Sequence, residues 1–218
     1  MALAQKPQKT FVPSNFDEAY YGQFEVKKRI PPKIRAQTLI ALSYFPELKK
    51  QRITFRFRKR KTPLTSRPRI LSSLLPKGWR SYVITISSHT TSNLEPILFK
   101  NLPFNAQIGV LGHEISHVQD YKARSSFQLM GLPFKLGNSD FVDRFEFRTD
   151  ETTISQGLGH QLLDWSIYVR KALGIKEWHG ASEAIEAGNL PTAGQRYMNP
   201  ATIKAYMKKS TLYQEPDG

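Results

Sequence analysis

The stretch Asn105–Arg124, NAQIGVLGHEISHVQDYKAR, contains the pattern on which the fold and the chemistry of this chain depend. Its two histidines, His113 and His117, are four residues apart, and Glu114 directly follows the first. On a helix these imidazoles lie on one face about 6 Å apart, so both can bind one ion. Glu114 is about 100° further around the helix, where its carboxylate can reach a water molecule beside the ion.

Apolar residues surround this motif and predict that its helix is buried; they are Ile108, Val110, Leu111, Ile115 and Val118. The chain has no cysteine, so a metal site must be built from His, Asp or Glu side chains. The HExxH pattern is typical of zinc peptidases, in which the histidines bind Zn²⁺ and the glutamate is the general base. Two core histidines bonded to the backbone or to acids are the alternative explanation.

A zinc site of this type needs a third ligand. The metzincin pattern HExxHxxGxxH is excluded, because Ala123 stands in place of its third histidine and Asp120 in place of its glycine. The downstream stretch DRFEFRTDET supplies the next carboxylates, which are Asp143, Glu146, Asp150 and Glu151. Glu146 and Asp150 are four residues apart and share a helical face. A solvated acidic face balanced by neighbouring arginines is the alternative explanation for these carboxylates.

Together, GHEISHVQDY and EFRTDETTI resemble the gluzincin metallopeptidases, particularly the branch of the CaaX prenyl proteases and their soluble minimal relatives. In that branch the HExxH helix is followed by a helix that carries E-x-x-x-D. The resemblance implies that His113, His117 and Glu146 bind zinc and that Glu114 is the general base. It also implies that Asp150 supports a ligand histidine from behind. The implied function is hydrolysis of a peptide or protein substrate through metal-activated water.

The resemblance extends over roughly residues 108–159 and explains nothing before Ser81. Thr149 is a mild departure, since a smaller residue usually precedes the aspartate. The family implies a strand that pairs with extended substrate, for which YVITISS or EPILFKN is a candidate. It also implies a group that stabilises the oxyanion. The candidates for that role are His160, Tyr168, His89 and His179, although a helix cap or a surface position is the simpler explanation for His160.

The remaining patterns predict an α+β, zincin-like fold in which a small early sheet packs on a mostly helical remainder. RITFRFRKRK alternates, with Ile53, Phe55 and Phe57 on one face and arginines on the other, and SYVITISS is a second strand. A third short strand is expected in EPILFKN. Helices are expected from about residue 14 to 30, in KIRAQTLIALSYFPELKK, over 139–159, in HQLLDWSIYVRKALG and in NPATIKAYMKK, with a loop around Gly131–Gly137. Residues 1–13 are expected to form a flexible arm, and residues 14–218 one domain.

Charge is unevenly distributed along the chain. Residues 27–80 contain 17 Lys/Arg and a single acid, Glu47, whereas residues 81–218 contain 13 Lys/Arg and 14 Asp/Glu. We therefore expect this basic third to lie away from the catalytic cleft and to govern location or partner choice. An alternative function follows, in which a zinc-binding scaffold binds nucleic acid, a wall polymer or a membrane surface. A solvated basic face is the simplest explanation, and the intact Glu114 argues against a zinc-bound but idle domain.

The sequence does not decide in which cellular compartment the protein resides. No run of about eighteen apolar residues is present, so no transmembrane segment is expected. Ala2-Leu3-Ala4 resembles the end of a signal peptide, yet the basic and apolar regions that would precede it are missing. The chain is accordingly expected to be either cytoplasmic or exported.

Overall fold

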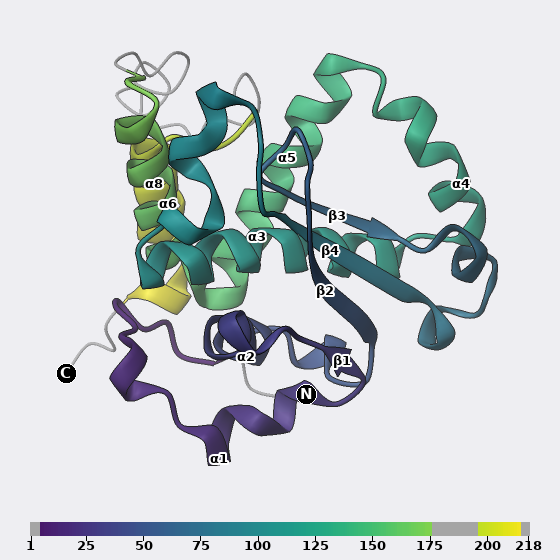
Figure 1. The fold of residues 1–218 in the computed structure, drawn as a ribbon, viewed down its shortest axis with the longest axis horizontal. Helices are drawn as coiled ribbons and strands as arrows, with labels where there is room; N and C mark the ends of the chain where they lie inside the picture. The colour runs from purple at the N-terminus through teal and green to yellow at the C-terminus, as the bar shows by residue number, and fades with distance from the viewer. Residues whose placement is uncertain (1–4, 176–195, 215–218) are drawn as a thin grey trace.

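The computed structural model describes residues 5–175 and 196–214, which form a mixed α+β arrangement (Figure 1). The helices are α1 (Glu18–Tyr21), α2 (Arg35–Ser43), α3 (Phe104–Ala123), α4 (Ser126–Lys135), α5 (Ser139–Thr153), α6 (Gly159–Ala172) and α8 (Pro200–Lys209). The strands are β1 (Lys28–Arg29), β2 (Arg52–Arg58), β3 (Leu64–Pro68) and β4 (Ser81–Ser87). Short 3-10 helices connect many of these elements. Among the described residues no helix is long and apolar enough to cross a bilayer.

The four strands form one sheet in the order β1-β2-β4-β3. Strand β2 runs parallel to β4, and β3 runs antiparallel to β4. The alternation predicted for β2 is confirmed, because Ile53 and Phe55 are buried on the face that packs against the helices. Strand β4 is buried on both faces, which explains its nearly continuous apolar sequence.

The expected third strand in EPILFKN is wrong. Residues 92–101 form the 3-10 helices η7 (Ser92–Ile97) and η8 (Phe99–Asn101), with Pro96 inside the first. Proline fixes φ near −65° and offers no N–H for a strand ladder. The strand that pairs with β4 on its other side is instead β3. Its sequence is short and polar, so the sequence pattern did not predict a strand there.

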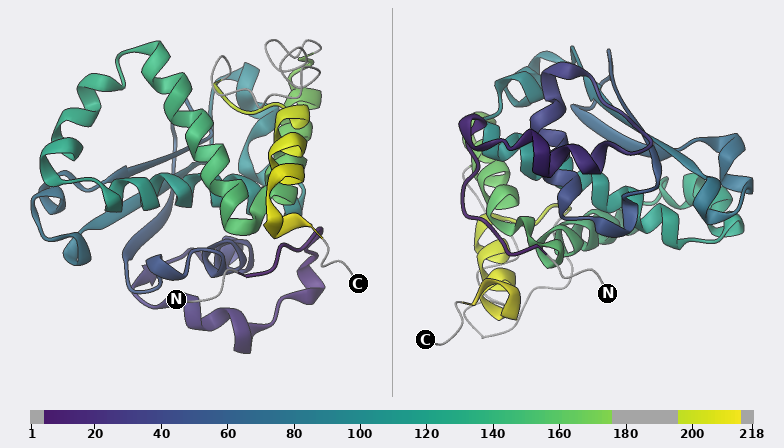
Figure 2. Two further views of the ribbon diagram at one scale, coloured as in Figure 1. Left: turned by 180° about the vertical axis from the view of Figure 1, so that it is seen from behind. Right: turned by 90° about the horizontal axis from the view of Figure 1, so that it is seen from below.

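Helix α3 occupies the centre of the molecule. Figures 1 and 2 show the N-terminal segments with α1 and α2 on one side of it, and α4 and α5 rising on the other. The predicted apolar residues are all buried, together with both histidines and Glu114. The helix is therefore surrounded by protein on most of its circumference rather than being amphipathic, and its polar groups must find partners inside the protein.

The structure differs from the sequence prediction in two further segments. The region around Gly131–Gly137, expected to be a loop, contains α4, whose first turn is closed by a capping box between Ser125 and Gln128. Leu129 and Leu132 are buried and anchor this helix, which tolerates Pro133 near its end. The expected helix over residues 14–30 is divided into α1, two 3-10 turns and β1.

The described part of the expected N-terminal arm packs on the helices. Phe11 is buried, and its N–H donates to Asn105 Oδ1 of α3 at 3.0 Å. The Gln161 side chain of α6 donates to the Gln8 carbonyl at 2.9 Å. The backbone at Gln8 and Phe11 is thus bound by polar groups of α6 and α3.

Close packing of α3 on α6 depends on a missing side chain. A Cβ at Gly109 would stand 2.2 Å from the Gln161 carbonyl oxygen and 2.4 Å from its carbonyl carbon. Backbone atoms of a neighbouring helix cannot move aside as a flexible side chain can. Gly109 is therefore required by packing rather than by backbone conformation.

We predict that Gly109→Ala lowers the free energy of unfolding by roughly 1–3 kcal/mol or more, the usual effect of overpacking. Gly131→Ala is the matched control, because Gly131 is also helical and nothing lies within 4 Å of its added Cβ. That control should leave stability unchanged or raise it by up to about 1 kcal/mol. Urea denaturation of both variants measures the difference, and equal stabilities would contradict the packing argument.

Candidate metal centre

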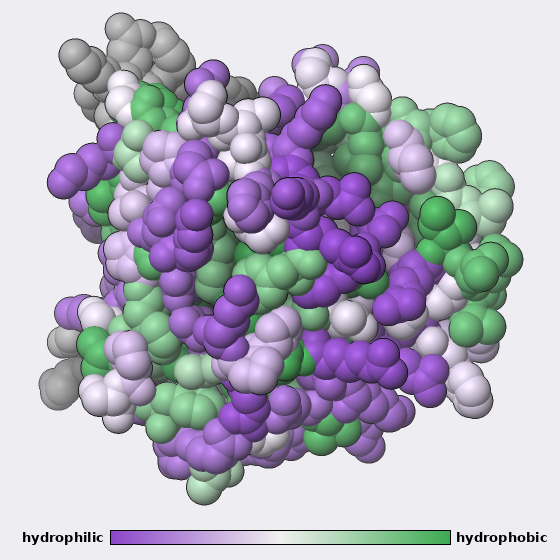
Figure 3. Space-filling view, viewed as in Figure 1, coloured by the Kyte–Doolittle hydropathy of each residue, from purple (hydrophilic) through white to green (hydrophobic). Residues whose placement is uncertain are grey.

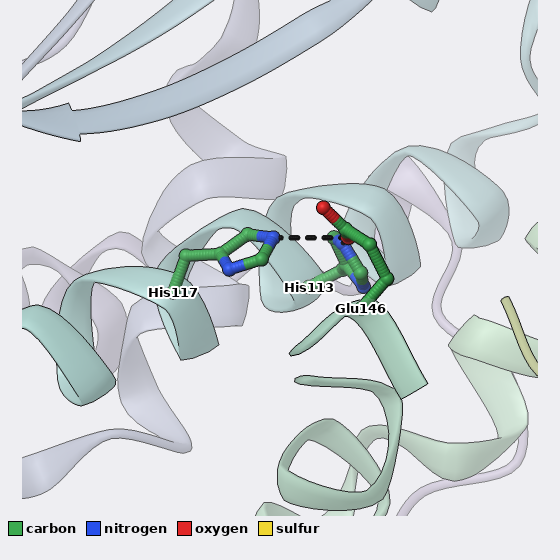
Figure 4. A group of neighbouring side chains, drawn as sticks. All are labelled: His113, His117 and Glu146. Carbon is green, nitrogen blue, oxygen red and sulfur yellow. Dashed lines mark hydrogen bonds and ion pairs between the residues drawn. The ribbon is translucent and has the colours of Figure 1, made fainter. Parts of the chain in front are cut away.

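Helices α3 and α5 bring three potential metal ligands together (Figure 4). His113 Nε2 lies 3.0 Å and His117 Nε2 3.2 Å from the same oxygen, Oε2 of Glu146. The ligand atoms of all three residues lie within 4.8 Å of one another, and the two histidines are buried. The grouping predicted from the i, i+4 histidines and the downstream glutamate is thus present, and it could hold a metal ion.

Asp150 binds the far side of the first histidine ring. Its Oδ1 lies 2.8 Å from His113 Nδ1, and its Oδ2 accepts the Met198 N–H at 2.7 Å. The side chain is 1% exposed, so both carboxylate oxygens are satisfied inside the protein. Asp150 thus contacts the ring nitrogen of His113 that faces away from Glu146, as the resemblance to the gluzincins implies.

Thr149 supports the second ring in the same way. Its hydroxyl donates to the Phe145 carbonyl at 2.8 Å, which leaves its oxygen to accept from His117 Nδ1 at 3.2 Å. Threonine at this position, where the family usually has a smaller residue, therefore gives His117 of α3 a hydrogen-bond partner on α5.

These partners determine what the three converging atoms can do. An acceptor beside each Nδ1 favours the tautomer with hydrogen on Nδ1, which leaves a lone pair on each Nε2. Two lone pairs and a carboxylate oxygen then face one another without a donor. Such a cluster requires a cation between its members, either a proton or a metal ion. This donor set of two imidazoles and a carboxylate fits Zn²⁺.

The pKa shifts of His113 and Glu146 also indicate that positive charge is stabilised between the members of the cluster. Burial alone would lower the pKa of His113, but hydrogen bonds and charge from Asp150 and Glu146 raise it well above its ordinary value. Burial alone would raise the pKa of Glu146, but the two histidines hold it well below its usual range. A protonated histidine beside an ionised glutamate is the metal-free state that a divalent ion would replace.

Glu114 lies beside this cluster with unused hydrogen-bonding capacity. It is buried, and its Oε2 has no hydrogen-bond partner among the described residues. Burial raises the pKa of its carboxyl group above the ordinary value, although the two histidines oppose that shift. The hydroxyl of Ser66 on β3 is near enough to Glu114 to lower that pKa, although no hydrogen bond of normal geometry joins the two groups. These orphaned atoms provide a polar site for water or substrate.

Tyr197 is a site residue that sequence reasoning missed. Its ring centroid lies 5.7 Å from that of His113, and Trp165 lies 5.5 Å from the same histidine. The residue is 40% exposed, but desolvation of its hydroxyl and the nearby carboxylates Glu146 and Glu114 raise the pKa of Tyr197. No spacing rule links Tyr197 to the HExxH motif. The neighbouring Met198 brings it there by binding Asp150.

The other residues that the sequence suggested for the site, which are the oxyanion candidates and the remaining carboxylates, are not part of the cluster in the described structure. His89 is exposed and contacts Ser88, and His160 packs against Tyr213 beside the N-terminal segment. Tyr168 packs against the hydrophobic core, and His179 lies outside the described residues. Asp143 pairs with Arg196 at 2.7 Å, and Glu151 is exposed, so neither joins the cluster.

Comparisons with protein-family models, with curated proteins and with solved structures found no match to this chain.

We predict that the protein binds Zn²⁺ and that Asp150→Asn lowers the affinity roughly 10–100-fold, because Asp150 orients His113 and raises its basicity. Asp140→Asn is the control, since Asp140 is exposed in the first turn of the same helix. Competition with a chromophoric chelator gives both affinities. Equal affinities for the two variants would contradict the role assigned to Asp150.

Proposed function

We propose that this protein is a zinc-dependent metallopeptidase with a zincin-like fold, in which His113, His117 and Glu146 hold the metal. The observation that carries the proposal is the unsatisfied, buried carboxylate oxygen of Glu114 beside the three converging ligand atoms. A site used only to hold a structural ion has no need of a base with an unoccupied oxygen. The intact base is also the reason to prefer an active enzyme over an idle zinc-binding scaffold.

A zinc ion held at this site would supply a Lewis acid that polarises the scissile carbonyl and acidifies water. Glu114 would accept the proton of that water and later return it to the leaving amine. The raised pKa of Glu114 suits this exchange, because a base titrating closer to neutral pH can both accept and release a proton. Asp150 and Thr149 would keep both imidazoles oriented throughout.

The sheet has an edge to which an extended peptide can add. Strand β3 is the edge strand of the sheet and pairs only with β4 among the described strands. Ser66 of β3 faces α3, where the Tyr121 hydroxyl donates to its carbonyl at 3.3 Å. We infer that substrate pairs with β3 by strand addition, beside Glu114. The earlier candidate YVITISS cannot serve, because β4 has neighbours on both sides.

We infer that Tyr197 stabilises the oxyanion, because its ring lies beside that of His113. A tyrosine hydroxyl is a donor at neutral pH, and desolvation and nearby carboxylates raise the pKa of this one further. A donor aimed at the developing negative charge stabilises the transition state more than the ground state. This assignment replaces the four candidates drawn from the sequence.

Binding of anionic partners remains a second candidate function, supported by the sheet's register. Arg67 pairs with Val83, and Arg56 pairs with Thr85, so both arginines lie on the face opposite to Ser66. The thickness of the sheet separates these charges from the metal cluster. The two activities can therefore coexist in one chain.

We predict that Glu114→Gln lowers kcat on a cleaved peptide roughly 10²–10⁴-fold, because the general base is lost. Zinc binding should persist, since Glu114 is not among the three converging ligands. Glu151→Gln, an exposed glutamate of α5, is the control and should remain active. Undiminished cleavage by the zinc-loaded Glu114 variant would contradict the mechanism.

We also predict that Tyr197→Phe lowers kcat roughly 10²–10³-fold with little change in KM, as when one oxyanion donor is removed. Zinc affinity should stay at the wild-type value, because the ring and its contact with His113 remain. Tyr20→Phe, at an exposed tyrosine of α1, is the matched control. A rise in KM with unchanged kcat would assign Tyr197 to substrate binding instead.

A further inference from the structure

Two neighbouring segments expose large apolar side chains on one side of the molecule. In the segment formed by η5 (Ile70–Leu74) and η6 (Lys77–Trp79), Leu71 is 86% exposed. On α4, Phe127 is 87% exposed and Phe134 is 86% exposed. We name this set the apolar ridge; its main members are Ile70, Leu71, Trp79, Phe127, Met130 and Phe134. Large apolar side chains that gather in this way mark an interaction site, unlike those scattered singly.

A buried arginine, Arg80, links the two segments that carry the ridge. Arg80 Nε donates to the Leu75 carbonyl at 3.0 Å, Nη1 to the Arg124 carbonyl at 2.7 Å and Nη2 to Ser126 Oγ at 3.0 Å. Arg80 thereby joins the segment after η5 to the start of α4. The two halves of the ridge form one surface because this side chain binds both.

An arginine-lined depression of 400 Å³ adjoins the ridge. Arg56, Arg67 and Arg69 line it, and Ile70 and Leu71 of the ridge form part of its wall. Burial and the neighbouring positive charges, of which Arg67 is the largest, lower the pKa of Arg56. In Figure 3 green atoms gather over α4 and the neighbouring η5 segment, with purple atoms beside them over the sheet. The depression is thus a concentrated positive site beside an apolar one.

The ridge and the depression both come from parts of the sequence that contain no acidic residue. Residues 48–94 contain no Asp or Glu, and neither do residues 121–139. These two stretches include every member of the ridge and every arginine of the depression. A surface with basic groups and apolar side chains, but no acids, matches a partner that is both anionic and apolar.

We propose that this face docks the protein on the surface of an anionic lipid bilayer, with the arginine-lined depression holding lipid phosphate groups. The ridge side chains enter the boundary between headgroups and acyl chains, where Trp79 is a residue type favoured at that depth. The exposed arginines add electrostatic attraction to anionic headgroups. The proposal uses no residue of the metal centre and does not depend on the peptidase activity.

Charge and shape favour a bilayer over the other partners of such a face. Two copies meeting through this face would bring like charges together, since it offers no acid to pair with the arginines. Nucleic acid would use the arginines but leave the protruding ridge in water. A fluid bilayer accommodates protruding side chains without a complementary groove.

The test is cosedimentation of the full chain with vesicles of phosphatidylcholine, alone or mixed with phosphatidylserine. Wild-type protein should bind the mixed vesicles and bind neutral vesicles far more weakly. The ridge variant F127S/F134S and the depression variant R56Q/R67Q/R69Q should each bind mixed vesicles roughly tenfold less tightly or worse. Added salt should weaken wild-type binding and the remaining binding of the ridge variant.

Matched controls separate this face from general charge. K171Q/K204Q/K208Q removes three exposed charges from α6 and α8 and should bind as wild type does. Circular dichroism and thermal unfolding confirm that every variant is folded. The proposal fails if wild type ignores mixed vesicles, or if the control loses binding as the depression variant does. It also fails if the ridge variant binds vesicles normally, if the face binds RNA with loss only in the arginine variant, or if ultracentrifugation shows a dimer that F127S/F134S abolishes.

Discussion

The buried carboxylate of Asp150 is the interaction on which the rest of the site depends. One oxygen holds the His113 ring of α3, and the other accepts the Met198 N–H of the segment before α8. A carboxylate at 1% exposure has to satisfy both oxygens inside the protein. In doing so it fixes the orientation of a potential ligand and brings Tyr197 next to that ligand. The same residue therefore assembles three segments that are far apart in the sequence.

That assembly requires an unusually close approach of helices to α3. Gly109 and Gly112 lack the side chains that would collide with the backbone of α6 and with Leu158. Because these side chains are absent, the connection between α5 and α6 packs directly against α3. Gly157, at φ 104°, lies within the π-type turn Ile154–Leu158 that separates α5 from α6. Small residues thus set the distance at which Glu146 and Asp150 meet the histidines.

The sequence predicted most of the candidate metal cluster and less of the fold. The i, i+4 spacing of His113 and His117 and the spacing of Glu146 and Asp150 are properties of single helices, so local periodicity was enough to predict that they share a face. Tyr197 and Ser66 reach the site through tertiary contacts that no spacing records. Strand β3 was missed because its pairing with β4 is decided by the sheet, not by the weak strand character of Leu64–Pro68.

Strand β3 also joins the two proposals of function and docking. Because successive residues of a strand point to opposite faces, Ser66 faces the metal cluster and Arg67 faces the depression. The chain then leads directly from β3 through Arg69 into the apolar ridge. If substrate pairs with β3 while the ridge rests on a bilayer, the edge that binds the peptide lies close to the membrane surface. Polypeptides held near that surface would then reach the site at a higher local concentration than free ones. The basic third of the chain, which contains β3 and the arginines of the depression, would in this way select the substrate without supplying the base or a metal ligand.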